Sequence, residues 1–200
     1  MKLITKVSVM KKPKNINYYL ILTFLFTISS QLYSQNIDKK NVFGIMAGGN
    51  ISNISNYEGK SSLGFSGGLY WEWKFSNKFS LQSNILYSQR GENKDGNFSD
   101  LKLDYINMPI LLKYYATEKL GVMTGVYMDF LLNVDSSNFD KDDFKQTDLG
   151  IPIGVSYDLS KNLQLGLSYN IGLTDILDNN PNSDKLTNNW GNFSLTYIFK

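Results

Sequence analysis

The feature that most constrains the fold is a two-residue alternation between apolar and polar side chains, which recurs along the chain after residue 35. Between residues 63 and 75 the odd positions carry Leu, Phe, Trp or Gly, while the even positions are mostly Gly, Ser or charged. Five segments repeat this pattern and three follow it less cleanly; together they cover 42–54, 63–75, 79–88, 101–115, 120–132, 148–159, 163–173 and 192–199. Because no segment after residue 35 shows the 3.6-residue period of a helix, the sequence predicts an all-β protein of eight strands.

The connections between these segments alternate strictly between short and long. The short ones are 76–78, 116–119 and 160–162, and the long ones are 55–62, 91–100, 133–147 and 174–188. An up-and-down barrel produces this order when short turns lie at one rim and long loops at the other. Pro109 and Pro152 each remove a backbone N–H from a predicted strand, so we expect a bulge or kink at both. The segment 120–132 is apolar on both faces near its end, which leaves its register the least defined.

Strand length and aromatic placement favour a membrane barrel over a soluble one. The runs are about 11–15 residues long, whereas globular strands have about 5–6 and a tilted transmembrane strand needs about 9–11. A soluble barrel with these strands would expose a large apolar surface to water. Aromatic residues gather near the short turns and the C-terminus, as in an interfacial girdle: Trp71, Trp73, Phe75, Phe79, Tyr114, Tyr115, Tyr157, Tyr197 and Phe199. We expect an eight-stranded antiparallel up-and-down transmembrane β-barrel in the cell outer membrane.

Residues 1–35 have the pattern of a secretory signal peptide, and 36–200 form the predicted barrel domain. Five lysines precede an apolar run at 18–28, which is followed by small and polar residues. We expect cleavage after Ser34 or Gln35, with either Met1 or Met10 as the start. Five of the 20 Lys and Arg and none of the 18 Asp and Glu lie in this leader, so the remainder has 15 basic and 18 acidic residues, a net charge of −3. This balance does not support a nucleic-acid partner.

Three stretches resemble the PorT-like outer-membrane β-barrel family: 43–50, 86–91 and 103–115. The last is the most specific, with a Pro-containing run that ends in Lys113-Tyr114-Tyr115. The resemblance covers essentially residues 42–200 and implies an eight-stranded barrel in the outer membrane of a Gram-negative bacterium. The family's founding member is tied to protein secretion, but the resemblance transfers no catalytic residues to this chain.

Charged residues occur at positions that the alternation turns into the barrel: Glu72, Lys74, Arg90, Lys113, Asp129 and Asp158. Side chains just fill the interior of an eight-stranded barrel, and a buried charge without a partner is costly. We therefore expect a structural polar network of Glu72, Arg90, Lys113 and Asp129. The alternative is a gated polar path for small solutes.

The composition argues against enzyme and metal chemistry. The chain has no histidine and no cysteine, which removes Ser-His-Asp catalysis, thiol nucleophiles and the commonest metal ligands. The acidic stretch 135–143 could suit calcium, but it lacks the glycine and glutamate of an EF-hand loop, and a solvated loop is the better interpretation. Gly44, Gly48 and Gly49 precede no helix and so make no dinucleotide site. We predict no enzymatic activity, no cofactor and no metal site.

The predicted role is structural or interactive. We expect a monomeric barrel surrounded by outer-membrane lipid, with long extracellular loops offered to partners. The alternatives are a component of an outer-membrane secretion complex, with envelope or secretion proteins as partners, and a narrow transporter of small solutes.

Overall fold

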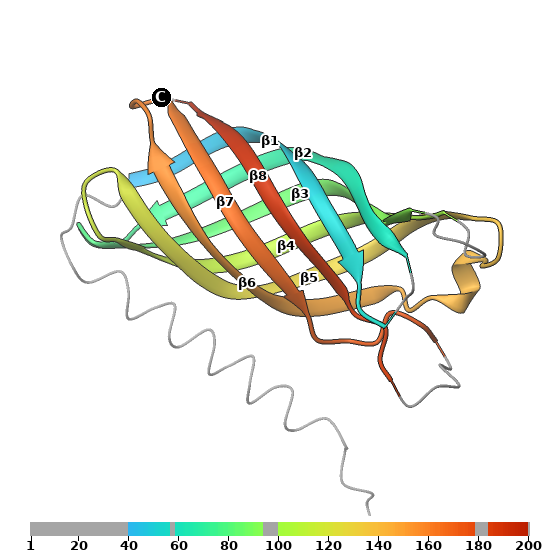
Figure 1. Cartoon of the computed structure of the whole chain (residues 1–200). Coiled ribbons are helices and arrows are strands. Elements are labelled where there is room, and N and C mark those ends of the chain that lie inside the picture. Colours follow the sequence, from blue (N-terminus) through green and yellow to red (C-terminus); the bar gives the residue numbers. More distant parts are fainter. Residues whose placement is uncertain (1–39, 57–58, 94–99, 179–183, 200) are drawn as a thin grey trace, which may run out of the picture. The chain divides into compact units, whose positions relative to one another are not determined.

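The structure is a computed structural model that describes residues 40–56, 59–93, 100–178 and 184–199. The predicted signal peptide therefore lies outside the described residues. Eight strands run in chain order: β1 (Lys40–Ile54), β2 (Lys60–Lys74), β3 (Phe79–Asn93), β4 (Leu101–Tyr115), β5 (Leu120–Ser136), β6 (Thr147–Asp158), β7 (Leu163–Gly172) and β8 (Asn188–Ile198). Each pairs antiparallel with the next, and β8 pairs with β1 to close the barrel (Figure 1). The predicted eight-stranded antiparallel up-and-down barrel is confirmed.

Helical structure is sparse in the described part of the chain. The 3-10 turn η2 (Lys141–Asp143) lies in the β5–β6 loop. Among the described residues no helix has the length and apolar character needed to cross a membrane.

The strand bounds differ from the sequence prediction mainly at the long connections. β5 has 17 residues and continues to Ser136, four residues beyond its predicted end, whereas β7 has only 10. The additional residues of β5 pair with the start of β4, for example Ser136 with Leu101. Residues 133–136 are mostly polar, which is why a loop was predicted there. They belong instead to a part of β5 that extends past the apolar part of the wall.

Alternate residues face inward and outward along every strand, as β4 illustrates. Its odd residues from Leu101 to Tyr115 are buried inside, whereas Met108, Ile110 and Leu112 are exposed on the outer wall. Together the outward apolar residues form a continuous apolar belt, with exposures that reach 77% at Leu63. Period-two alternation produces this belt because successive Cβ atoms point to opposite faces of the sheet.

Large aromatic side chains gather at the short-turn end of the outer wall. Trp73, Phe75, Phe79 and Tyr114 form a chain of ring contacts with centroids 5.1–6.4 Å apart. Tyr115 was wrongly predicted to belong to this girdle. It is the last residue of β4, and its parity turns the ring into the barrel, where it is 7% exposed.

The two prolines interrupt strand pairing without shifting the register. The pairing of β3 with β4 is interrupted at Pro109, and that of β5 with β6 at Pro152, yet it resumes in the same register on both sides. Of the predicted bulge or kink, a bulge is therefore absent at both prolines. Register shifts occur instead between Ser61 and Ser66 of β2 and between Asp104 and Tyr105 of β4.

The apolar core lies at the long-loop end rather than in the middle of the barrel. A cluster of buried side chains, which we call the cap, closes this end; it comprises Ile54, Leu101, Leu103, Tyr105, Leu131, Phe144 and Ile176, with Val134, Phe139, Leu177 and Leu186 packed against it. Phe144 and Leu177 form an isolated β-bridge that joins the β5–β6 loop to the β7–β8 loop. The apolar end of the predicted segment 120–132 is thereby explained, because Leu131 joins the cap while Leu132 remains on the outer wall.

Candidate functional site

The charged groups inside the barrel form two separate clusters. In the upper cluster, nearer the long-loop end, Arg90 of β3 pairs with Asp129 of β5: Nη1 lies 2.5 Å from Oδ2 and Nη2 donates to Oδ1 at 3.3 Å. Asn107 of β4 also donates to Asp129 Oδ1, at 2.6 Å, and Arg90 Nε donates to Ser88 Oγ at 3.1 Å. Both charged side chains are fully buried. A fork of donors on one carboxylate is the strong form of a buried ion pair.

Aromatic rings enclose the Arg90 guanidinium. Its carbon lies 3.2 Å from the Trp190 ring centroid, 5.0 Å from that of Tyr105 and 6.0 Å from that of Tyr127. Tyr127 and Trp190 meet edge to face at 4.8 Å. A cation over aromatic faces is stabilised by their quadrupoles, and more so away from water.

The lower cluster, nearer the short turns, surrounds Glu72 of β2. Lys113 Nζ lies 3.4 Å from Glu72 Oε2, Tyr115 donates to Oε1 at 2.6 Å, and Tyr70 donates to Oε2. Lys113 also donates to Tyr70 at 3.2 Å and to Gln164 Oε1 at 3.3 Å. These contacts satisfy both buried charges with groups from several strands, which is the condition for an ion pair to persist in a low dielectric.

The four predicted network residues all lie inside the barrel and are at most 1% exposed: Glu72, Arg90, Lys113 and Asp129. The structure does not bring them into one network. Arg90 pairs with Asp129 and Lys113 pairs with Glu72, as separate ion pairs. The two further inward charges predicted are only half-buried: Lys74 lies over the Tyr115 ring at 4.7 Å, and Asp158 accepts from Gln164 at 2.6 Å.

Sequence reasoning missed two buried carboxylates. Asp148 of β6 is paired in register with Asp129 and accepts a hydrogen bond from Thr174. Glu92 of β3 accepts from Asn53 Nδ2 at 2.8 Å and from the Ile54 N–H at 3.3 Å. Both keep the inward parity of their strands, Asp148 with Gly150 and Glu92 with Arg90. Asp148 already lies on the inward face of the predicted segment 148–159, whereas Glu92 lies four residues past the end of the predicted segment 79–88.

Glu92 lies beyond the apolar belt, at the long-loop end of β3. Along the outward face of β3, Tyr87 is the last apolar residue before the long-loop end, and the next outward residue is the polar Gln89. Burial raises the pKa of Glu92 to about 7, and the hydrogen bond from the Ile54 N–H only partly opposes this. The site therefore favours the neutral carboxyl.

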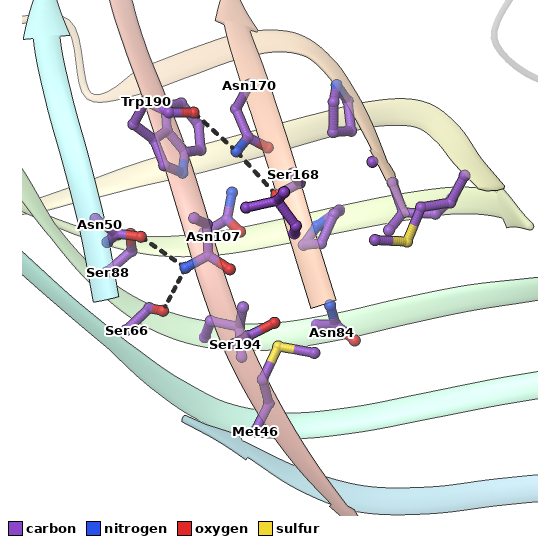
Figure 2. Close-up of a pocket in the computed structure, with 18 of the residues that line it drawn as sticks. Met46, Asn50, Ser66, Asn84, Ser88, Asn107, Ser168, Asn170, Trp190 and Ser194 are labelled. Carbon is purple, nitrogen blue, oxygen red and sulfur yellow. Dashed lines mark hydrogen bonds between the residues drawn. The ribbon is translucent and has the colours of Figure 1, made fainter. Parts of the chain in front are cut away.

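A small cavity lies between the two charged clusters, with Gln82 on the side of Glu72 and Asn107 on the side of Asp129. Figure 2 shows residues that line it. The cavity has a volume of about 50 Å³. On its polar wall Asn192 donates to Asn50 and Ser66, whereas Asn170 donates to the Trp190 carbonyl oxygen. The apolar wall comprises Leu86, Leu111, Met123 and Leu167. Asn107 and Trp190 line its upper side and connect it to the Arg90 cluster.

In the acidic stretch of the β5–β6 loop, one carboxylate forms a hydrogen bond with the local backbone. Asp143 Oδ2 accepts from the Asp140 N–H at 2.8 Å, next to η2, while Asp140, Asp142 and Asp143 remain exposed. Within the described ranges, no group of three or more acidic side chains is arranged to hold a metal ion.

Comparison with known proteins places this barrel in a family. The family model described as "Outer membrane protein beta-barrel domain" matches residues 30–178. None of the curated proteins compared with the chain matches it.

Solved structures similar to this chain include several bacterial surface barrels. Neisserial surface protein A shares 18% identity with a TM-score of 0.52, over 80% of this chain and 97% of that one. Ail of Yersinia pestis shares 14% identity with a TM-score of 0.49, over 82% and 100% of the two chains. OprG of Pseudomonas aeruginosa shares 15% identity with a TM-score of 0.40, over 80% and 94%. The first of these likenesses supports the fold.

Proposed function

Because the chain belongs to the outer membrane protein beta-barrel domain family and is a protein of the outer membrane, we propose that it is a closed barrel with a structural or interaction role. In this proposal the barrel is a monomeric anchor in the outer-membrane lipid, and its long loops are the part offered to partners outside the cell.

The observation that carries the proposal is the obstruction of the interior at three levels. From the short turns upward these are the Lys113–Glu72 ion pair, the Arg90–Asp129 ion pair and the apolar cap. Open aqueous channels belong to barrels of about 16 strands or more, whereas side chains fill an eight-stranded barrel. The space left between the ion pairs is only about 50 Å³.

The strand lengths support a role at the cell surface. A 15-residue strand such as β3 is about 50 Å long at about 3.3 Å per residue, and a tilt of about 40° leaves about 38 Å along the barrel axis. The apolar band of an outer-membrane barrel is only about 25 Å tall. The strands therefore extend past the membrane, and longer extracellular loops than periplasmic turns are the rule in such barrels.

Conductance in planar bilayers tests whether the barrel is closed. We expect no current steps from the reconstituted protein at any moderate voltage, while a wide porin inserted into the same bilayers conducts. Reproducible steps would overturn the closed barrel and favour the narrow transporter.

Labelling of intact cells tests the orientation. An amine reagent that does not cross the outer membrane should modify exposed lysines at the long-loop end, such as Lys141 and Lys145. Lys78, Lys119 and Lys161 are exposed in the short turns and serve as matched controls that stay unlabelled until the cells are opened. The reverse labelling pattern would overturn the proposed orientation.

A second candidate, a component of a secretion complex, is favoured by the resemblance of 103–115 to the PorT-like family. In β4 this run supplies Asn107 to the upper cluster and Lys113 to the lower one. Extraction in mild detergent followed by pull-down discriminates the candidates: defined secretion subunits in constant ratio favour the complex, and a lone barrel favours the first proposal.

We also propose that the protein is not an enzyme. The sequence has no histidine or cysteine, and the buried carboxylates Glu72 and Asp129 are held in ion pairs. Such carboxylates are not free to act as a general acid or base on a substrate.

A further inference from the structure

The central cavity has a polar wall whose side chains are largely bonded to one another. Asn192 donates to Asn50 Oδ1 at 2.8 Å and to Ser66 Oγ at 3.0 Å (Figure 2). Asn50 in turn donates to Ser88 Oγ at 3.0 Å. The wall thus brings amides and hydroxyls from β1, β2, β3 and β8 to one place, and both donors and acceptors lie at the surface of the cavity.

Gln82 is the exception on this wall. Its Nε2 donates to Asn84 Oδ1 at 3.4 Å, but its Oε1 has no hydrogen-bond partner among the described residues. The side chain is 2% exposed and lines the cavity. A buried amide oxygen without a partner costs free energy, and buried polar atoms of this kind are normally satisfied by protein or by water.

The size of the cavity limits what can satisfy Gln82. One buried water needs about 10–15 Å³ of such volume, and a cavity that takes up benzene has about 150 Å³. The 50 Å³ here holds about three to five water molecules and no organic solute of benzene size. A mixed wall with several polar partners also suits water better than an apolar occupant.

We propose that the central cavity is a binding site for a small cluster of ordered water molecules, one of which donates a hydrogen bond to Gln82 Oε1. The cluster lies between the two ion pairs and links their surroundings. Gln82 is opposite Glu72 in the register of β2 and β3, at the lower side. Asn107, which donates to Asp129, lines the upper side. The waters thus connect the polar groups around the two ion pairs, which the protein side chains alone leave unconnected.

Solution NMR of the perdeuterated, methyl-labelled wild-type protein in deuterated detergent tests the proposal directly. We expect NOE and ROE cross-peaks of opposite sign, the signature of long-lived water, between water and the methyl groups of Leu86, Leu111 and Met123, which line the cavity. Leu103 is fully buried in the cap, and its methyl groups are the matched control that should show none. Absence of cross-peaks at all three cavity residues overturns the proposal.

A substitution gives an independent test. Gln82→Met keeps the length of the side chain and removes the amide. If water donates to Oε1 in the wild type, the variant loses that hydrogen bond as well as the one to Asn84. We therefore expect its urea midpoint of unfolding to fall below that of the wild type. Gln89→Met on the outer wall removes a comparable weak bond, to Asp104 at 3.3 Å, and should lower the midpoint less. An equal or higher midpoint for Gln82→Met would instead identify Oε1 as an unpaired atom and overturn the proposal. If that variant does not fold, the wild-type cross-peaks decide.

Discussion

The guanidinium of Arg90 on β3 lies against the indole face of Trp190 on β8, with 3.2 Å between the guanidinium carbon and the ring centroid. These strands are not neighbours, because β1 and β2 lie between them. The contact therefore spans the interior, and Arg90 extends further to Asp129 on β5. One side chain thus ties together three separate parts of the wall, and its partners give the first prediction.

Replacing Asp129 with alanine should destabilise the barrel strongly. The change leaves the Arg90 charge buried without its ion-pair partner, and such a loss costs about 3–5 kcal/mol. Urea unfolding in lipid vesicles measures it. Asp104→Ala is the control, since this half-buried carboxylate on the outer wall accepts one bond from Gln89 and should cost only about 0.5–1.5 kcal/mol. Similar losses for both variants would contradict a special role of the buried pair.

The neighbouring residues Tyr114 and Tyr115 should respond differently to loss of the hydroxyl group. Tyr115 donates to Glu72 Oε1 at 2.6 Å inside the barrel, whereas Tyr114 is exposed on the outer wall. Hydrogen bonds to a charged group contribute about 1.5–3 kcal/mol, so Tyr115→Phe should lose about that much stability. Tyr114→Phe should change it by less than about 0.5 kcal/mol. Equilibrium unfolding of both variants checks this, and the reverse order would show that the inward placement of Tyr115 is wrong.

Gly91 should not tolerate a side chain. Its φ is 150°, and a Cβ there would lie 1.9 Å from the Leu101 carbonyl oxygen. We expect Gly91→Ala to cost at least about 1–3 kcal/mol of stability. Gly49→Ala is the matched control, because its Cβ would meet only the Gly64 carbonyl oxygen, at 3.9 Å. Heat-modifiable migration on gels gives a first comparison, and equal melting temperatures would contradict the prediction.

Glu92 should make the stability of the long-loop end depend on pH. Its pKa is raised to about 7 in the folded protein, against about 4.3 for an ordinary glutamate. Between these values the folded state binds more protons than the unfolded state, so stability falls as the pH rises through this window and stays lower above it.

Glu92→Gln removes this pH dependence. The variant should match the wild type near pH 4 and become the more stable of the two as the pH approaches 8, as measured by unfolding at fixed pH values. Glu118→Gln, in an exposed short turn, controls for the loss of a surface carboxylate. A constant difference between Glu92→Gln and wild type across this range would refute the prediction.

The local pattern of the sequence was enough to predict the wall of the barrel. Side chains alternate between the two faces of a strand, so the order of residues within each segment already separated Met108 and Ile110, on the outer wall, from Asn107 and Lys113, inside. The alternation of short and long connections gave the up-and-down order. The prediction for side chains failed where a residue's position in the alternation and its chemical character disagree. Tyr115 is such a case, because its aromatic ring suggested the girdle while its position turned it inward.

Only the tertiary structure decided which inward residues meet. The register and closure of the barrel bring Arg90 to Asp129 and Lys113 to Glu72, and no spacing along the chain encodes those pairs because their partners lie on strands that are not adjacent. The cap likewise depends on long loops that fold back, so that Phe144 meets Leu177. The central cavity is what remains after both ends are filled. Strand periodicity is a property of neighbouring residues, whereas filling the interior depends on contacts across the whole barrel.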